Sequence, residues 1–230
     1  EAIDAIRSES DAMERLVEQL LFLARGDNDT QPIRPQLMDL TAVAEDVLRE
    51  EQMIHPERAF LARWQGPVVV RADPGLVKQV MRILMDNSVK YSGPEGRVYL
   101  RVSAQKGYAR VTVQDEGMGI VPQAIPHIFD RFYRTDSSRA RQTGGTGLGL
   151  SIARWIVDRH GGWFEVVSRE DVGTRITFVL PLEGTARAGG SIFSGAGTAP
   201  STPGSPTIWT AVWPPTTRAG ERNIPGAAAR

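Results

Sequence analysis

The sequence contains no cysteine and only three histidines in 230 residues. The absence of cysteine excludes disulfide bonds and thiolate metal centres, and three scattered histidines cannot form a histidine-rich metal site. No apolar run approaches the roughly 20 residues that a membrane-spanning helix requires, and no signal pattern opens the chain. Basic and acidic side chains both number 27, so the net charge of zero argues against nucleic acid as the main partner.

What is present suits one sizeable core, because 41 % of the residues are apolar and 23 % are charged. The first 25 residues carry an apolar heptad pattern in steps of three and four, interrupted only by Ser10: Ile3, Ile6, Met13, Val17, Leu20 and Ala24. This period favours pairing with another helix. A terminal helix that packs on its own domain is the alternative.

Residues 30–183 predict a compact α/β unit. Helices are expected from Thr41 to just before Pro56, from Pro74 with Asp73 as N-cap, and after Gly149. Strands are expected at 59–64 and 67–72, followed by two antiparallel pairs, 97–105 with 108–116 and 163–168 with 174–182. The irregular stretch 120–146 is typical of a lid, and the glycine- and proline-rich residues 184–230 predict a disordered tail.

Glycines crowd the segment before the last predicted helix: Gly144, Gly145, Gly147 and Gly149. The spacing fails the nucleotide P-loop pattern because Leu150 replaces its lysine, and it fails the dinucleotide fingerprint because no strand leads into it. Glycines nevertheless let backbone N–H groups approach an anion, and the following helix directs its positive end there. We therefore predict a phosphate-facing loop, with a flexible hinge as the alternative.

Two further segments carry polar groups that suit a nucleotide. QDEGMGI sets Asp115 at a strand end before two glycines, and its carboxylate can accept a hydrogen bond from an exocyclic amine such as that of adenine. MDNSVKYS carries Asn87, Lys90 and Tyr91, which offer an amide oxygen for Mg²⁺, a point charge for phosphate and a ring beside base or ribose. Taken singly, each segment also fits an ordinary turn or a solvated helix face.

The order of four motifs resembles the ATP-binding catalytic domain of bacterial sensor histidine kinases, in the wider group that includes type II topoisomerases and the heat-shock chaperone. These motifs are the asparagine helix, the Asp-Gly-x-Gly strand end, the aromatic IFDRFYR at 128–134 and the glycine loop. The match covers about residues 38–182, and residues 1–25 resemble the second helix of that family's dimerisation hairpin.

The resemblance implies an α/β fold of Bergerat type, a two-layer sandwich in which helices cover one face of a mixed sheet, preceded by a long dimerisation helix. It divides the chain into four parts: a partial dimerisation helix at 1–27, a linker at 28–37, the ATP-binding catalytic domain at 38–183 and the tail at 184–230. The ligands that it implies are ATP and Mg²⁺.

The resemblance also implies roles for single residues. Asp115 would bind the adenine amine, Asn87 would ligate Mg²⁺, and Asn87, Lys90 and Arg134 would be catalytic. The implied ATP-binding set is Asn87, Lys90, Tyr91, Asp115, Gly117, Gly119, Ile120, Gly145, Thr146, Gly147, Leu148 and Gly149. Gly117 and Gly119 would let the chain pass close to the base. Phe129 and Phe132 would anchor the lid, with plain core packing as the alternative, and Arg139 and Arg141 are candidates to offset charge, with simple loop exposure as the alternative.

Two departures from the family pattern bear on mechanism. Relatives that hydrolyse ATP carry a glutamate four positions before the asparagine, where this chain has Ile83, and isoleucine cannot activate water or a serine hydroxyl. This favours histidine as the acceptor. None of His55, His127 and His160 lies in an acceptor-like segment, and His160 is expected to close a helix C-terminus instead.

We therefore expect a histidine-kinase catalytic domain that transfers the γ-phosphoryl group of ATP to a histidine on a helix outside this chain, for onward transfer to a response-regulator aspartate. The expected partners are a second copy, through the helix hairpin of the parent, and a receiver domain. The chain starts without Met inside a helix, so we expect a cytoplasmic domain of a parent in the plasma membrane, with membrane contact only through upstream segments. The alternative is a non-catalytic, nucleotide-binding dimerisation or regulatory module.

Overall fold

The structure is a computed structural model that describes residues 2–134, 145–183 and 208–212. Its helices are α1 (Ala2–Asp27), α2 (Leu40–Ile54), α3 (Pro74–Tyr91), the short 3-10 helix η1 (Ile125–His127) and α5 (Gly149–Arg159). Its strands are β1 (Gln36–Asp39), β2 (Phe60–Trp64), β3 (Val69–Ala72), β4 (Val98–Gln105), β5 (Tyr108–Asp115), β6 (Trp163–Arg169), β7 (Gly173–Pro181) and β8 (Ile208–Val212). Within these ranges, no helix combines the length and the apolar character needed to cross a membrane.

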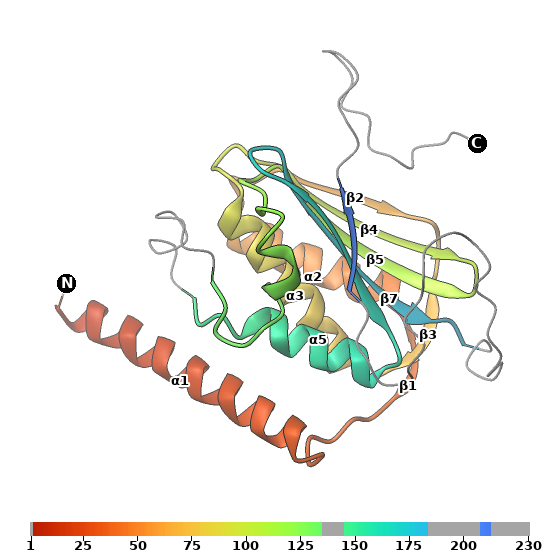
Figure 1. The fold of residues 1–230 in the computed structure, drawn as a ribbon, viewed down its shortest axis with the longest axis horizontal. Coiled ribbons are helices and arrows are strands. Elements are labelled where there is room, and N and C mark those ends of the chain that lie inside the picture. The colour runs from red at the N-terminus through yellow and green to blue at the C-terminus, as the bar shows by residue number, and fades with distance from the viewer. Residues whose placement is uncertain (1, 135–144, 184–207, 213–230) are drawn as a thin grey trace.

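One mixed sheet forms the framework of the molecule, with the strand order β2-β4-β5-β7-β6-β8. The β2–β4 and β6–β8 pairs are parallel, and the other neighbours are antiparallel. β1 and β3 form a separate antiparallel pair. Helices α2, α3 and α5 lie on one face of the large sheet (Figure 1). The two-layer sandwich with a mixed sheet is therefore confirmed, as are both predicted antiparallel pairs.

The helix α3 shows why the local sequence signals work. Asp73 caps it, because its carboxylate accepts hydrogen bonds from the backbone N–H groups of Gly75 (3.0 Å) and Leu76 (3.2 Å). Pro74 takes the first helical position, where a missing N–H costs nothing. One side of the helix is buried against the sheet, as the spacing of the apolar residues predicts: Val77, Val80, Met81, Leu84 and Met85. This packing fixes the outward face of α3.

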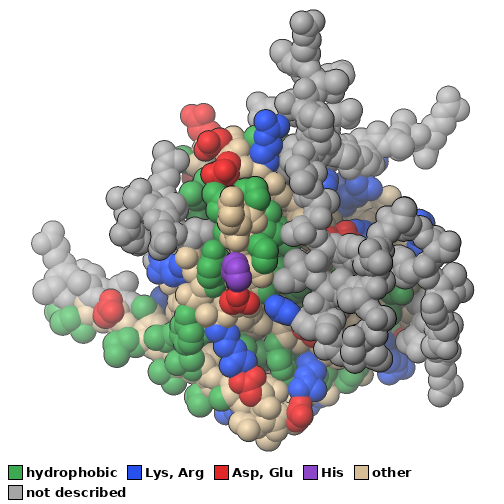
Figure 2. All heavy atoms as spheres, viewed as in Figure 1, with side chains coloured by type: hydrophobic (Ala, Val, Ile, Leu, Met, Phe, Trp, Pro, Cys, Tyr) green, Lys and Arg blue, Asp and Glu red, His purple; other side chains and the backbone are tan. Residues whose placement is uncertain are grey.

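The long helix α1 keeps its predicted heptad stripe exposed. Ile3 is 74 % exposed and Val17 is 53 % exposed, and apolar side chains are visible along this helix in Figure 2. A different face of its C-terminal half contacts the domain, where Leu23 is buried and the ring of Phe22 packs edge-on against Trp155 at 5.2 Å between ring centroids. The helix thus packs on its own domain while its seam stays unpaired in this structure.

The predicted tail contains one element that its composition did not indicate. Ile208–Val212 form β8, which pairs in parallel with β6 in a register that sets Ile208 opposite Phe164. This short run, IWTAV, contains β-branched and aromatic residues that favour a strand. The expectation of a tail without strands therefore does not hold for these residues, and the remainder of 184–230 lies outside the described residues.

Candidate functional site

Asp115 ends β5 in the middle of the sheet, and its carboxyl is 5 % exposed. Its Oδ1 accepts hydrogen bonds from the backbone N–H groups of Gly117 (2.9 Å) and Thr174 (3.2 Å). The hydroxyl of Ser88 on α3 donates to Oδ2 at 3.3 Å. Burial raises the pKa of Asp115 to about 6, although these three hydrogen bonds act in the opposite direction. Groups from three parts of the fold thus hold this carboxyl in one orientation.

The two glycines after Asp115 lie against protein backbone. A Cβ on Gly117 would come within 2.5 Å of the carbonyl oxygen of Tyr91, and one on Gly119 within 2.0 Å of the carbonyl oxygen of Arg169. Gly119 also has a φ of +69°, which favours glycine. These close approaches explain why both positions require glycine, in addition to the predicted role of letting the chain pass close to a base. The loop is consequently fixed between the end of α3 and the turn that joins β6 to β7.

One face of the last turns of α3 carries the polar residues predicted to meet a nucleotide. Successive residues turn by about 100° around a helix, so Lys90 and Tyr91 lie within about 60° of Asn87, on either side of it. Lys90 Nζ lies 5.0 Å from the ring centroid of Tyr91. Ile83 shares this face one turn earlier, where its Cγ2 would lie 3.3 Å from a Cβ on Gly149. The face of α3 that carries Asn87 is therefore directed to the start of α5.

The glycine loop reaches α3 from the opposite side. Gly145 has a φ of +125° and Gly147 a φ of +73°, so both use backbone conformations that L side chains rarely adopt. A Cβ on Gly145 would lie 2.5 Å from Lys90 Nζ. Leu148 is fully buried, and its backbone N–H donates to Thr146 Oγ1 at 3.3 Å. No side chain caps the N-terminus of α5, which leaves its first N–H groups for an anion.

The predicted adenine-binding residue and the predicted phosphate-binding loop both contact the last turns of α3. Ser88 touches Asp115, and Lys90 lies beside Gly145. The two α3 residues are two positions apart, or about 3 Å along the helix axis, and they point to different sides. Asn87 lies between them around the helix. Asp115 and Gly145 therefore lie on either side of a single α3 surface.

The aromatic motif divides between core and surface. Phe129 is 2 % exposed and packs on Phe164 with ring centroids 4.8 Å apart, so core packing, the alternative given for it, describes this side chain. Phe132 is 59 % exposed and has a φ of +61°. Its backbone N–H donates to the carbonyl oxygen of Gly147 at 3.0 Å. Phe132 thus reaches the glycine loop through its backbone.

Arg134 is the other motif residue that touches the loop. Its guanidinium donates to the carbonyl oxygen of Gly145 at 2.8 Å. Ile120, at the other end of the lid stretch, donates its backbone N–H to Ser168 Oγ at 2.8 Å. The candidates Arg139 and Arg141 lie outside the described residues.

His160 closes the C-terminus of α5, as predicted. Its ring Nδ1 lies 2.7 Å from the carbonyl oxygen of Ile156, and Nε2 accepts the backbone N–H of Asp73 at 3.0 Å. Because Nε2 accepts, Nδ1 must carry the proton and donate it to the carbonyl. The sequence did not indicate this second bond, which joins the end of α5 to the start of α3. His127 pairs with Asp130 at 2.9 Å.

Contacts with α1 were also missed by sequence reasoning. The hydroxyl of Thr146 in the glycine loop donates to Gln19 Oε1 at 2.7 Å. Arg131 holds Asp27 through two hydrogen bonds of 2.7 and 2.6 Å, which lower the pKa of the Asp27 carboxyl. These partners are more than a hundred positions apart, so no local pattern could have indicated them. The long helix thus holds both the glycine loop and the aromatic segment.

The comparison with known families identifies the class of the domain. Residues 72–184 match the family model of the histidine kinase-, DNA gyrase B-, and HSP90-like ATPases. The matched range contains α3 and the two segments that flank its surface, the strand end at Asp115 and the glycine loop. The sandwich fold is therefore that of this ATP-binding class.

Individual relatives narrow the class to sensor kinases. The chain is 40 % identical over 177 residues to the sensor histidine kinase YkoH of Bacillus subtilis. The aligned residues make up 77 % of this chain and 38 % of YkoH. Among solved structures, the mycobacterial sensor histidine kinase MprB is 32 % identical with a TM-score of 0.59, covering 64 % of this chain and 98 % of MprB. Full-length ShkA in complex with AMPPNP is 27 % identical with a TM-score of 0.68, covering 78 % of this chain and 38 % of ShkA.

The chain belongs to the sensor histidine kinase family and contains its ATP-binding catalytic domain. It spans about two fifths of the length of YkoH.

Proposed function

We propose that this domain binds ATP with Mg²⁺ across the outward face of α3 and transfers the γ-phosphoryl group to a histidine of a dimerisation helix. The phosphoryl group then passes to an aspartate of a response regulator. The observation that carries the proposal is the convergence of the Asp115 carboxyl and the glycine-loop amides on one turn of α3.

The adenine end follows from the chemistry of Asp115. A buried carboxylate that already accepts hydrogen bonds from Gly117 and Thr174 can accept one more from the adenine amine. At the other end, backbone amides of Gly145–Gly149 and the N-terminus of α5 receive the triphosphate, with Lys90 beside them. The AMPPNP complex of ShkA supports nucleotide binding by this fold.

The Mg²⁺ assignment was tested against the donors that the site offers. Within the described residues, no group of three or more His, Cys, Asp or Glu side chains could hold a metal ion alone. Mg²⁺ commonly takes one protein oxygen and completes its shell with phosphate oxygens and water. The amide oxygen of Asn87, on the face between Ser88 and Lys90, fits that single-donor role. When bound with ATP, Mg²⁺ would neutralise phosphate charge.

The acceptor chemistry follows from Ile83. This side chain stands on the Asn87 face against the start of α5, where a carboxylate would be needed to activate water. An imidazole is itself a nucleophile. In the transfer, a bond forms between the imidazole nitrogen and the γ-phosphorus while the bond to the β–γ bridging oxygen breaks, and its electrons leave with ADP. Arg134, bonded to the glycine loop, lies where it can offset the developing charge.

The decisive experiment combines the full chain, γ-labelled ATP and a purified dimerisation hairpin that carries an acceptor histidine. We expect an acid-labile, base-stable label on the hairpin, and none when its histidine is replaced by glutamine. Asn87→Ala should abolish the label. Gln52→Ala, which changes an exposed amide on α2, should leave it intact.

A second candidate is a regulatory module that binds ATP without transferring phosphate. It is favoured by the engagement of the histidines in this chain, since His160 is held by Asp73 and Ile156. This candidate predicts nucleotide-dependent association through the exposed seam of α1 and no label on any hairpin. ATP binding without transfer would therefore select it over the kinase.

A further inference from the structure

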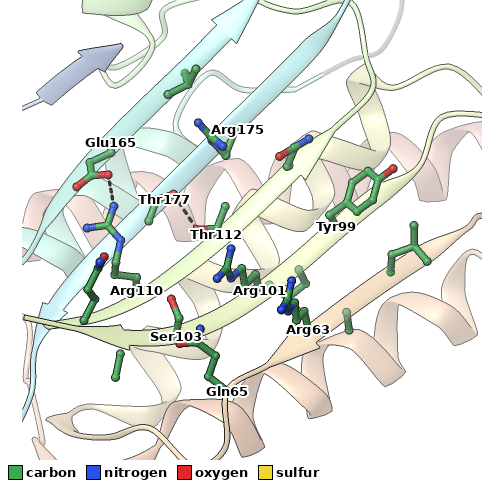
Figure 3. Close-up of a pocket in the computed structure, with 17 residues that line it drawn as sticks. Arg63, Gln65, Tyr99, Arg101, Ser103, Arg110, Thr112, Glu165, Arg175 and Thr177 are labelled. Carbon is green, nitrogen blue, oxygen red and sulfur yellow. Dashed lines mark hydrogen bonds and ion pairs between the residues drawn. The ribbon is translucent and has the colours of Figure 1, made fainter. Parts of the chain in front are cut away.

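The face of the sheet that the helices do not cover carries a hollow of about 630 Å³ (Figure 3). Side chains alternate along β4, so Arg101 points into this hollow while Leu100 and Val102 are buried on the helical side. The hollow is thus separated from the α3 surface by the thickness of the sheet. Its volume is typical of sites for small molecules.

Positive charge is concentrated around this hollow. Four arginines line it from four neighbouring strands, namely Arg63, Arg101, Arg110 and Arg175, and among the described lining residues Glu165 is the one that is acidic. The chain as a whole carries no net charge, so this accumulation is local. Glu165 is already in an ion pair with Arg110. Among the described lining residues, arginines therefore outnumber carboxylates by four to one.

The strand register forces these cations together. Arg63 and Arg101 are direct partners in the parallel β2–β4 pair, and like charges directly opposite one another destabilise a sheet. Burial lowers the pKa of Arg175; the charge of Glu165 acts in the opposite direction, and the charges of Arg110 and Arg101 lower the pKa further. Arg101 Nε is buried and has no hydrogen-bond partner within the part of the chain that the structure describes. A bound anion would offset the repulsion between these arginines and would give Arg101 Nε a hydrogen-bond acceptor.

The floor of the hollow adds hydroxyl groups to the guanidinium rim. Thr112 and Thr177 lie opposite each other on β5 and β7, and their hydroxyl oxygens are 2.8 Å apart. In such a pair one hydroxyl donates to the other, so the second can still donate to a ligand. Guanidinium groups bind phosphate oxygens in pairs of parallel hydrogen bonds. Hydroxyl and guanidinium donors around one concave surface suit phosphate oxygens.

We propose that this hollow binds a compact anion that carries two or more phosphate groups. Arg63, Arg101 and Arg175 contact the phosphates, and the two threonines support them from the floor. Because the sheet separates this hollow from the α3 surface, the anion binds together with ATP rather than in its place. The proposal does not depend on phosphotransfer.

The test follows backbone amide signals of the full-length, ¹⁵N-labelled chain by NMR, with excess ADP and Mg²⁺ present to occupy the nucleotide site. Inorganic tripolyphosphate and a sugar bisphosphate are titrated separately, and the source is assigned to the probe that binds more tightly. We expect saturable shifts of the Arg101, Thr112 and Thr177 signals. The absence of such shifts with both probes, or shifts confined to Gly145–Gly149, would overturn the proposal.

Paired variants distinguish binding in the hollow from non-specific attraction between the phosphate probe and surface arginines. Arg101→Gln with Arg175→Gln should weaken binding of the better probe at least tenfold. Arg49→Gln, which removes an exposed arginine on α2 that pairs with Asp46, should leave it within twofold. Equal weakening by both, or equally tight binding of orthophosphate, would contradict a site for multivalent phosphates. The dispersion of the amide spectrum reports whether each variant is folded, and the single variant Arg175→Gln repeats the test if the double variant is not.

Discussion

The two ends of the nucleotide site are built in different ways. Asp115 lies inside the sheet, 5 % exposed, with hydrogen bonds from a neighbouring strand, the following loop and α3. The glycine loop has a backbone hydrogen bond from Phe132 and is otherwise held by long side chains, such as Arg134 and the α1 residue Gln19. The adenine end is therefore part of the core, and we expect the phosphate end to move more easily.

The largest effect is expected from a glycine at the adenine end. Gly119→Ala places a Cβ 2.0 Å from the Arg169 carbonyl oxygen in a backbone conformation of φ +69°. We expect a loss of about 3 kcal/mol in the free energy of unfolding, measured by denaturant titration. Gly93→Ala is the matched control, because nothing lies within 4 Å of its added Cβ. Equal stabilities of the two variants would contradict a rigid adenine end.

Asp115→Asn tests recognition at the same end without adding volume. The amide presents one acceptor and an NH₂ group that repels the adenine amine. We expect ATP affinity to fall by about 1 to 3 kcal/mol in a calorimetric titration. Asp46→Asn, an exposed change on α2, serves as the control. Unchanged affinity in the Asp115 variant would remove the carboxyl from the site.

Gly147→Ala provides the counterpart at the phosphate end. Its added Cβ would lie 2.8 Å from the backbone of Phe132 at a φ of +73°. Because this loop can shift, we expect ATP affinity to fall by about tenfold, or about 1.4 kcal/mol, with a smaller loss of stability than Gly119→Ala causes. A stability loss as large as that of Gly119→Ala would mean that both ends are equally rigid.

The raised pKa of Asp115 predicts a pH dependence confined to the adenine end. Its pKa of about 6 in the free protein means that the carboxyl gains a proton as the pH falls through 6. Hydrogen bonding to the adenine amine favours the ionised form, so adenosine affinity should fall severalfold between pH 7 and pH 5. Adenosine is the suitable probe because it carries no phosphate that titrates in this range. Asp115→Asn should abolish the dependence, and a persisting one would assign it to another group.

The smallest effect is expected where α1 meets the loop. Gln19→Ala removes the acceptor of the Thr146 hydroxyl, a partly exposed hydrogen bond. We expect a change in ATP affinity of about 0.5 kcal/mol or less, together with faster hydrogen exchange of the glycine-loop amides. Unchanged exchange would show that α1 does not restrain the loop. Glu18→Ala, on the exposed side of α1, should change neither quantity.

Local patterns predicted the parts of the molecule that depend on nearby residues. The Asp73 cap, the buried stripe of α3 and the two hairpins follow from hydrogen bonds and side-chain periods within a few positions. The site residues followed from four motifs in a fixed order. By contrast, composition alone failed for β8, because a strand needs a partner edge that the sequence does not specify.

The sequence by itself determined which residues are polar at the ends of α3 and β5, and which glycines can adopt the required backbone conformations. Only the tertiary structure decided that Asp115 is desolvated, that Lys90 meets Gly145, that α1 restrains Thr146, and that four arginines share one sheet face. The physical reason is that burial, strand register and helix docking join residues far apart in the chain. Such contacts leave no periodic pattern in the sequence.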